Sequence, residues 1–220
     1  MINFHPDMQQ LDLFVAGNAE PSLALILSAH IDMCRHCMQK CQKLQQIQSI
    51  EALSEGTRLN TQMSNMLQTI TALPQHKDQP VALSPSKVLE LDGKTFEVPR
   101  SLKRFVQHTG NWSRLVGKLW QAPVDLGYMG KANFIYMEKG GKVPEHTHKG
   151  SELTLVIDGQ YSDGLAHYDC GDFTLLDGQH KHQPHSVVDG GCLVFTIVDK
   201  PLHFTSGIAR LLNPFSHLFF

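Results

Sequence analysis

Hydrophobic residues recur every three or four positions along the first third of the chain. The pattern runs through residues 19–48 and 49–73, with few glycines and with a proline near the start of the first stretch. Such spacing is typical of amphipathic helices, and proline is favoured in the first turn of a helix. A shorter helix is expected over residues 7–16. Residues 1–75 are therefore predicted to form a small bundle of three or four helices.

From residue 88 onwards the pattern changes to that of a β-rich unit. Short runs such as TFEV, ANFIYM, LTLVID and CLVFTIVD are separated by glycine, proline or aspartate at spacings of about 8–12 residues. This arrangement favours an antiparallel sandwich or barrel. Residues 74–87 contain three prolines and many polar side chains, so we expect a linker over 76–87. The predicted fold class is α+β, with the helical bundle followed by an antiparallel β-barrel over 88–220.

Composition narrows the expected partners and compartment. The 220 residues are 41% hydrophobic, and a net charge of −2 gives little electrostatic support for direct nucleic-acid binding. No apolar run approaches the roughly 20 residues of a membrane-spanning helix, and MINFHPDMQQ lacks the features of a signal peptide. We therefore expect a cytoplasmic protein without membrane contact. Thiols stay reduced in that compartment, so the five cysteines are expected to be metal ligands or buried groups.

The segment HIDMCRHC (30–37) carries the first candidate metal site. His30, Cys34 and Cys37 stand at positions i, i+4 and i+7, which share one face of a continuous α-helix. Two thiolates and an imidazole suit zinc, and a structural zinc site needs a fourth protein ligand. The alternatives are a buried apolar helix face and a redox Cys-x-x-Cys motif, which is normally found beside a strand–helix unit.

Three residues are candidates for the fourth ligand, namely His5, His36 and Cys41. On a continuous helix Cys41 lies about 16.5 Å along the axis from His30, which is too far for both to bind one ion. His36 points away from Cys34 on the same helix. His5 belongs to a separate segment that can fold over the cluster, and we expect it to complete the site.

The segment EHTHKGSE (145–152) carries the second candidate site. His146 and His148 are two positions apart, so on a strand both face the same side, and Glu152 follows beyond a bend. The fourth ligand is expected to be His182. Such a mixed set of nitrogen and oxygen ligands suits zinc, iron, manganese or nickel. The alternative is a surface strand that happens to carry two histidines.

The spacing of these residues resembles the two motifs of the cupin family. GGKVPEHTHKGSELTLVIDG (140–159) follows the first motif, in which glycine, His-x-His, glutamate and glycine stand at fixed intervals. The second motif places a histidine eleven residues after a glycine, which His182 satisfies; His180 and His185 are alternatives. The chain departs from the second motif at Asp177, Gln179 and Ser186. The resemblance implies a jelly-roll barrel that holds a metal ion.

A helical His-x3-Cys-x2-Cys unit followed by a cupin domain resembles the ChrR-type anti-sigma factors along nearly the whole chain. In that family a zinc domain binds an extracytoplasmic-function sigma factor, and the cupin domain is needed to sense singlet oxygen or organic peroxide. The resemblance implies two metal sites: site 1 with His5, His30, Cys34 and Cys37, and site 2 with His146, His148, Glu152 and His182. It implies zinc in both sites, with iron, manganese or nickel as alternatives in site 2.

The resemblance also implies what the protein does. Residues 1–75 would bind an extracytoplasmic-function sigma factor and release it under oxidative stress, without enzymatic activity and without direct contact to nucleic acid. Leu23, Ile26 and Leu27 are expected to form part of the surface that covers the sigma factor. The alternative function is a metal-dependent cupin enzyme, a dioxygenase or isomerase, with a helical accessory domain. A metal-storage module is a third reading, which the defined spacing of the histidines disfavours.

Overall fold

The computed structural model describes residues 1–54, 60–74, 88–115, 117–127, 131–205, 207, 210–211 and 213–214. The predicted linker, residues 76–87, lies outside the described residues. The division of the chain into domains at 1–75 and 88–220 stays a prediction. None of the helices in the described ranges combines the length and the apolar character that crossing a membrane requires.

The N-terminal part of the described chain contains the helices α1 (Met8–Val15), α2 (Pro21–Met33), α3 (Arg35–Ser54) and α4 (Thr61–Ala72). Local sequence explains where they begin. The Asp7 side chain accepts a hydrogen bond from Gln10 N, and the Gln10 side chain accepts one from Asp7 N, so both amides are satisfied at the start of α1. Pro21 opens α2, and the Asn60 side chain accepts a hydrogen bond from Met63 N at the start of α4.

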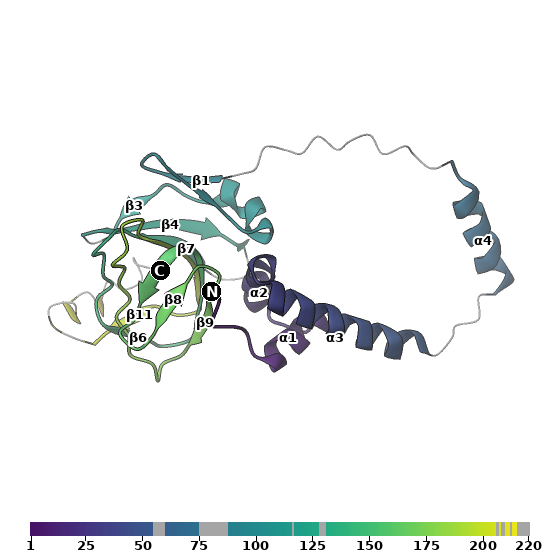
Figure 1. Cartoon of the computed structure of the whole chain (residues 1–220), viewed down its shortest axis with the longest axis horizontal. Coiled ribbons are helices and arrows are strands. Elements are labelled where there is room, and N and C mark those ends of the chain that lie inside the picture. Colours follow the sequence, from purple (N-terminus) through teal and green to yellow (C-terminus); the bar gives the residue numbers. More distant parts are fainter. Residues whose placement is uncertain are drawn as a thin grey trace.

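The prediction of one continuous helix over residues 19–48 is wrong at Cys34. This residue ends α2 in an extended conformation, with φ −109° and ψ 99°, and α3 begins at Arg35. Cys34 Sγ accepts a hydrogen bond from Cys37 N at 3.5 Å, in the way that a polar side chain caps the first turn of a helix. The chain therefore turns inside the HIDMCRHC segment, and α2 and α3 run in different directions (Figure 1).

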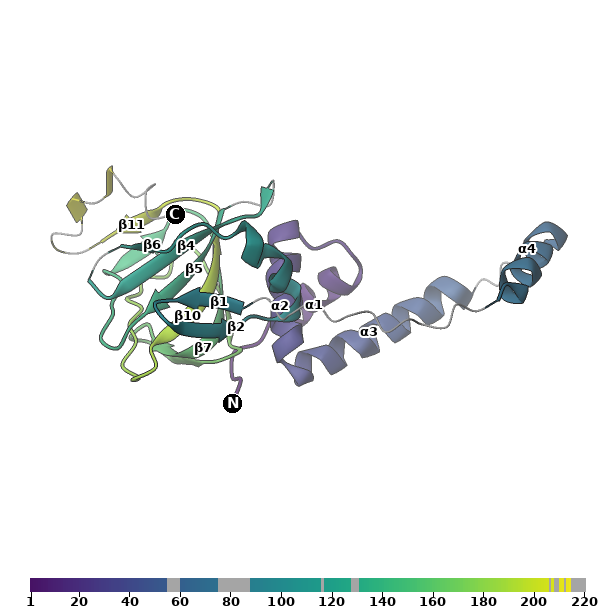
Figure 2. The ribbon, with the colours of Figure 1, turned by 90° about the horizontal axis from the view of Figure 1, so that it is seen from above.

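An antiparallel β-sandwich follows the helices (Figures 1 and 2). Its strands are β1 (Val88–Leu91), β2 (Lys94–Glu97), β3 (Ser113–Arg114), β4 (Leu119–Asp125), β5 (Lys131–Met137), β6 (His146–His148), β7 (Glu152–Ser162), β8 (His167–Asp169), β9 (Phe173–Leu176), β10 (Cys192–Val198) and β11 (Leu202–Phe204). The large sheet has the order β3-β4-β5-β10-β7-β8, with β9 also paired to β7, while β6 pairs with β11 and β1 with β2. The predicted α+β class, helices followed by an antiparallel β domain, is confirmed.

The hydrophobic pattern did not predict every element. A 3-10 helix, η1 (Arg100–His108), lies between the β1–β2 hairpin and β3. It packs against α2 through the buried side chains of Leu102 and Phe105, and Ser101 donates hydrogen bonds to the Asp32 carboxylate on α2. This contact ties the helical part to the sandwich.

The main hydrophobic core is shared between α2 and the sandwich. Ile26 and Leu27 are fully buried in the same cluster as Phe134 of β5 and Phe195 of β10. Leu23 is partly buried against that cluster. The prediction that Leu23, Ile26 and Leu27 form a partner-binding face is therefore wrong. The strands already remove this apolar surface from water, which is the favourable outcome for such side chains within a single chain.

The C-terminal half of α3 and the whole of α4 keep several apolar side chains exposed. In its C-terminal half α3 exposes Ile47, Ile50 and Leu53, and α4 buries none of its residues. Both views show α4 well apart from the sandwich (Figures 1 and 2). The exposed apolar surface therefore lies on α3 and α4, and not on α2 as the sequence predicted.

Candidate metal centres

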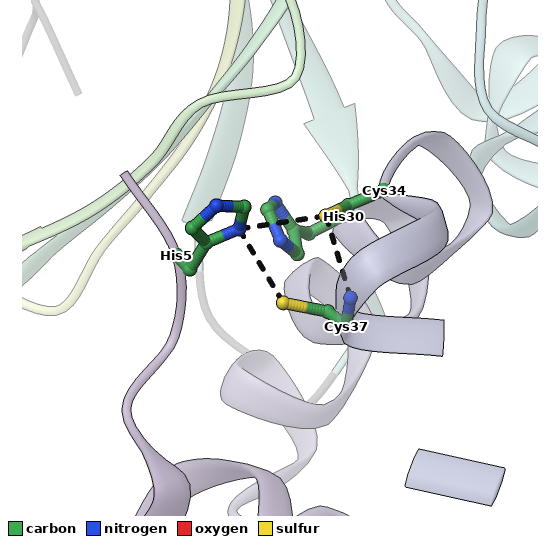
Figure 3. A group of neighbouring side chains, drawn as sticks. All are labelled: His5, His30, Cys34 and Cys37. Carbon is green, nitrogen blue, oxygen red and sulfur yellow. Dashed lines mark hydrogen bonds between the residues drawn. The ribbon is translucent and has the colours of Figure 1, made fainter. Parts of the chain in front are cut away.

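Four side chains from three segments meet at site 1 (Figure 3). His5 comes from the N-terminal segment (residues 1–6), and His30 comes from the last turn of α2. Cys34 lies at the junction of the two helices, and Cys37 lies in the first turn of α3. The four ligand atoms lie within 4.8 Å of one another. Because the chain turns at the junction, both sulfurs face the His5 ring.

The separations within site 1 suit one small ion. The Sγ atoms of Cys34 and Cys37 lie 3.4 Å and 3.5 Å from His5 Nδ1. Around a tetrahedral zinc ion with bonds of about 2.0–2.3 Å, ligand atoms lie roughly 3.3–3.8 Å apart. Two sulfurs and two imidazole nitrogens therefore fit zinc both in type and in spacing.

The two other candidates for the fourth ligand lie outside this group of atoms. Cys41 is buried one turn beyond Cys37 on α3, in a small apolar cluster with Leu11. The side chain of His36 is exposed, and its ring centroid lies 5.3 Å from that of His5. The structure thus brings His5 to the cysteines, as the sequence led us to expect.

A backbone carbonyl of the sandwich orients the His30 ring. His30 Nδ1 donates a hydrogen bond to the Gly171 carbonyl at 2.8 Å, so the lone pair of the neutral ring is on Nε2. This Nε2 atom is buried and has no hydrogen-bond partner. Burial lowers the pKa of His30 to about 4, which keeps the ring neutral near pH 7. The sequence marks Gly171 only as the glycine of the second cupin motif, and its contact with His30 was not predicted, because the two residues lie 141 positions apart.

The sulfur atom of Cys37 needs a nearby cation in order to bind as a thiolate. Burial, reinforced by the neighbouring Cys34, raises the pKa of Cys37 to about 12. Such a thiol stays protonated at pH 7 unless a nearby positive charge favours the thiolate. A divalent ion at the centre of the group supplies that charge and also a partner for the buried Nε2 of His30. The chemistry of the donor set therefore fits a bound metal.

Site 2 lies inside the sandwich. His146 and His148 of β6 are both buried, as their spacing of two predicts for one face of a strand. Glu152 is the first residue of β7, just beyond the bend. Two backbone hydrogen bonds of 3.1 Å, from His146 N to His182 O and from His182 N to His146 O, hold the fourth residue beside β6. The structure therefore brings together all four residues predicted for the site.

The ligand atoms of site 2 converge on one point. His182 Nε2 lies 2.9 Å from the Nε2 atoms of both His146 and His148, and Glu152 Oε2 lies 3.0 Å from His148 Nε2. His146 Nδ1 donates a hydrogen bond to the Pro144 carbonyl at 2.8 Å, so its Nε2 carries the lone pair. Three imidazole nitrogens and one carboxylate oxygen fit zinc, iron, manganese or nickel.

Burial and neighbouring charges shift the pKa values of three site 2 residues, His146, Glu152 and His182. Burial lowers the pKa of His146 to about 4 and also lowers the pKa of His182. Burial alone would raise the pKa of Glu152, but the hydrogen bond with His148 and the other nearby histidines outweigh it and lower that pKa to about 2. Neutral imidazoles and an ionised carboxylate are the forms that bind a metal ion.

The alternative ligands of the second motif point elsewhere. His180 is exposed, and its Nδ1 lies 2.9 Å from the Asp177 carboxylate. His185 Nδ1 donates a hydrogen bond to the Gln183 carbonyl at 3.1 Å. Neither histidine is part of the converging group of ligand atoms.

A small cavity of about 40 Å³ adjoins site 2. Besides the site residues its lining is mostly apolar, with Ile135, Met137, Val143 and Val194. A cavity of this size holds roughly three water molecules. It leaves room beside the ligands for water or for a molecule of similar size.

Comparison with known proteins finds similarity to ChrR in both parts of the chain. Residues 111–200 match the family model described as the ChrR cupin-like domain. Over 221 aligned residues, covering 97% of this chain and 98% of the relative, the sequence is 26% identical to the anti-sigma-E factor ChrR of Cereibacter sphaeroides. The predicted resemblance to the ChrR-type anti-sigma factors is confirmed.

The similarity to ChrR extends beyond the sandwich, because the aligned 97% of the chain includes the helical part with site 1. A solved structure, that of Rhodobacter sphaeroides SigE in complex with the anti-sigma ChrR, contains a chain with the same fold. The match has a TM-score of 0.65 at 22% identity, and it covers 90% of this chain and 100% of that chain. Helices and sandwich are thus joined in both proteins.

Proposed function

We propose that this protein is a zinc-dependent anti-sigma factor that holds an extracytoplasmic-function sigma factor and releases it under oxidative stress. The observation that carries the proposal is the similarity to the anti-sigma-E factor ChrR along 97% of the chain. A cupin enzyme that shared only the sandwich would match over the sandwich alone. The grouping of two histidines with two cysteines in the helical part agrees with the proposal.

Zinc in site 1 is proposed to hold the helical part in its binding-competent shape. The ligands come from the N-terminal segment, from α2 and from α3, so one ion would fasten three segments together. A structural zinc site with four protein ligands stabilises small domains in this way. In site 2 we propose zinc as well, and iron, manganese and nickel suit the same nitrogen and oxygen ligands.

The exposed apolar surface of α3 and α4 is the proposed binding surface for the sigma factor. The exposed apolar side chains here are Met63, Met66, Leu67 and Ile70 on α4 and Leu73 directly after it. They recur at intervals of three and four residues, so they form one stripe along the helix. A helix with such a stripe gains stability by laying it into an apolar groove of a partner.

Oxidation of the site 1 thiols is the proposed route to release. A hydroperoxide that oxidises Cys34 and Cys37 converts the two thiols into a disulfide and is itself reduced to an alcohol and water. A disulfide no longer offers two thiolates to a metal, so the three segments would separate. The sandwich with site 2 is proposed to sense the signal.

Capture of the partner tests this function. The full chain carries an affinity tag and is isolated from the cells in which it naturally occurs, and the proteins bound to it are identified by mass spectrometry. We expect an extracytoplasmic-function sigma factor at a near-equal molar ratio, and its loss from the Cys37→Ser variant. A sigma factor captured equally well by that variant would contradict the role of zinc, and the absence of any sigma factor would contradict the proposed function.

A further inference from the structure

One residue of the sandwich holds the segment that carries His5. The amides Asn3 N and Phe4 N both donate hydrogen bonds to Asp172 Oδ1, at 2.6 Å and 2.9 Å. Phe173 N donates a third hydrogen bond to the Phe4 carbonyl at 3.1 Å. Asp172 is only 1% exposed, so water does not compete for its carboxylate. The residue that precedes His5 is therefore held on both sides by the sandwich.

The neighbouring residue of the same turn holds the other histidine of site 1. The β8–β9 turn (residues 170–172) places the Gly171 carbonyl 2.8 Å from His30 Nδ1. Gly171 has φ +92°, and a Cβ atom there would lie 2.5 Å from the Ile2 side chain. A side chain at this position would be strained by the backbone conformation and would force the Ile2 side chain to move. Both imidazole ligands of site 1 are thus positioned by one turn of the sandwich.

The β8–β9 turn is also hydrogen-bonded to β7, the strand that starts with Glu152 of site 2. Gly171 N donates a hydrogen bond to the Val156 carbonyl at 2.8 Å, and Val156 N donates one to the Asp172 carbonyl at 3.0 Å. Directly after the turn, β9 pairs with β7, and Leu176 at the end of β9 stands opposite Glu152. A shift of Glu152 therefore reaches the turn through one continuous ladder of backbone hydrogen bonds.

Contacts between aromatic rings form a second connection between the N-terminal segment and site 2. The Phe4 ring lies 4.7 Å from the Tyr168 ring, and Tyr168 stacks on Tyr161 with centroids 4.7 Å apart. Tyr161 lines the small cavity beside site 2. A groove of about 430 Å³ has both His5 and His182 in its lining, so the two metal sites open onto the same hollow.

We propose that Asp172 is a positioning residue through which site 2 controls the hold of site 1 on its metal. The inference rests on the proposed function and concerns its regulation. A metal in site 2 fixes Glu152 and hence the register of β7, β9 and the turn between β8 and β9. Loss or change of that metal shifts the turn, and the backbone bonds that place His5 and His30 weaken. Site 1 then releases its metal faster.

Cobalt provides a probe that reports site 1 alone. The full chain is loaded with Co²⁺, and the absorption band of sulfur-to-cobalt charge transfer is followed after excess chelator is added. Site 2 contains no sulfur ligand, so this band arises only from Cys34 and Cys37. The intensity of this band also reports how many thiolates are bound to the cobalt, and the visible d–d bands report whether its coordination is tetrahedral.

A double-mutant cycle measures the coupling between the two sites. Glu152→Ala is expected to speed the loss of the cobalt band about tenfold, the lower end of the effect of removing support around metal ligands. Asp172→Ala is expected to speed it by a similar factor, and the double variant is expected to be no faster than Asp172→Ala alone. Independent effects, which multiply to about a hundredfold in the double variant, would overturn the proposal. So would an unchanged rate in Glu152→Ala.

Two further variants separate positioning from general loosening. Asp32→Ala removes the hydrogen bonds between α2 and Ser101, which also tie the helices to the sandwich but do not touch site 1. It is expected to leave the rate of band loss unchanged. If Asp172→Ala does not fold, Asp172→Asn takes its place in the cycle, since it keeps the size of the side chain but removes the charge that strengthens the hydrogen bonds from Asn3 N and Phe4 N. A full tenfold effect of Glu152→Ala in the Asp172→Asn background would overturn the inference.

The failure of the inference differs from the failure of the proposed function. If the wild-type chain develops no sulfur-to-cobalt band, then site 1 does not bind metal, and the zinc-dependent function fails. If the band forms but decays at a rate that does not depend on Glu152 or Asp172, only the coupling fails. The cobalt experiment needs no sigma factor, so its result does not depend on partner binding.

Discussion

Cys37 and Cys41 lie one turn apart on α3, and both are buried, yet only Cys37 reaches the converging atoms of site 1. Cys41 packs instead against apolar neighbours such as Leu11. The pair therefore separates the role of a metal ligand from the role of a buried thiol. At the scale of single residues this contrast provides the most direct test of site 1.

Cys37→Ser is expected to lower the metal content of the full chain by one equivalent, because a serine hydroxyl is a poor ligand for zinc compared with a thiolate. Elemental analysis of the freshly purified protein measures this. Cys41→Ser is the matched control, with the same change at a similarly buried position, and it should keep full metal content. Equal metal content in both variants would show that Cys37 is not a ligand.

At the scale of elements, α2 and α3 have opposite environments. Ile26 of α2 is fully buried in the core that α2 shares with the sandwich, whereas Ile47 of α3 is 54% exposed. An isoleucine in each helix thus reports whether that helix faces the sandwich or the solvent. This distinction decides which helices are available to a partner.

Ile26→Ala is expected to lower the free energy of unfolding by about 2–5 kcal/mol, because it leaves a cavity in a packed core. Ile47→Ala, the matched control, should change it by less than about 0.5 kcal/mol. Denaturant titration of the full chain measures both. A small effect of Ile26→Ala would mean that α2 is not packed against the sandwich as described.

Introducing a negative charge into the apolar stripe on α4 tests the proposed binding surface. Leu67→Glu and Ile70→Glu are expected to reduce capture of the sigma factor at least tenfold, since a charge would have to be buried in the interface. Neither should change the melting temperature of the free chain, because α4 buries no residue. Gln68→Glu adds the same charge beside the stripe and should leave capture intact. Undiminished capture by the stripe variants would place the binding surface elsewhere.

At the scale of the whole molecule, two metal ions are expected to hold together a chain whose helices and sandwich share one core. Removal of both ions with a chelator is expected to lower the melting temperature, because ligands that bind only the folded state stabilise it. Calorimetry with and without chelator measures the shift, and elemental analysis should find two equivalents before treatment. Fewer than two equivalents in untreated protein would contradict one of the two sites.

Much of the site was predictable from the sequence, because metal ligands often stand at short, fixed spacings. A spacing of two predicts that His146 and His148 share one strand face, and the resemblance to the cupin motifs implies Glu152 and His182. Local spacing does not supply His5, and only the need for a separate segment to close site 1 points to it.

The sequence by itself determined the helical and β-rich classes of the two parts of the chain and the chemistry of both ligand sets, because hydrophobic period and residue type are local properties of a chain. Only the tertiary structure decided which surfaces face each other. It turned the chain at Cys34, buried Ile26 and Leu27 against the strands, and set the β8–β9 turn beside His5 and His30. Contacts between residues more than a hundred positions apart depend on how the apolar faces pack in three dimensions, and no local pattern encodes that choice.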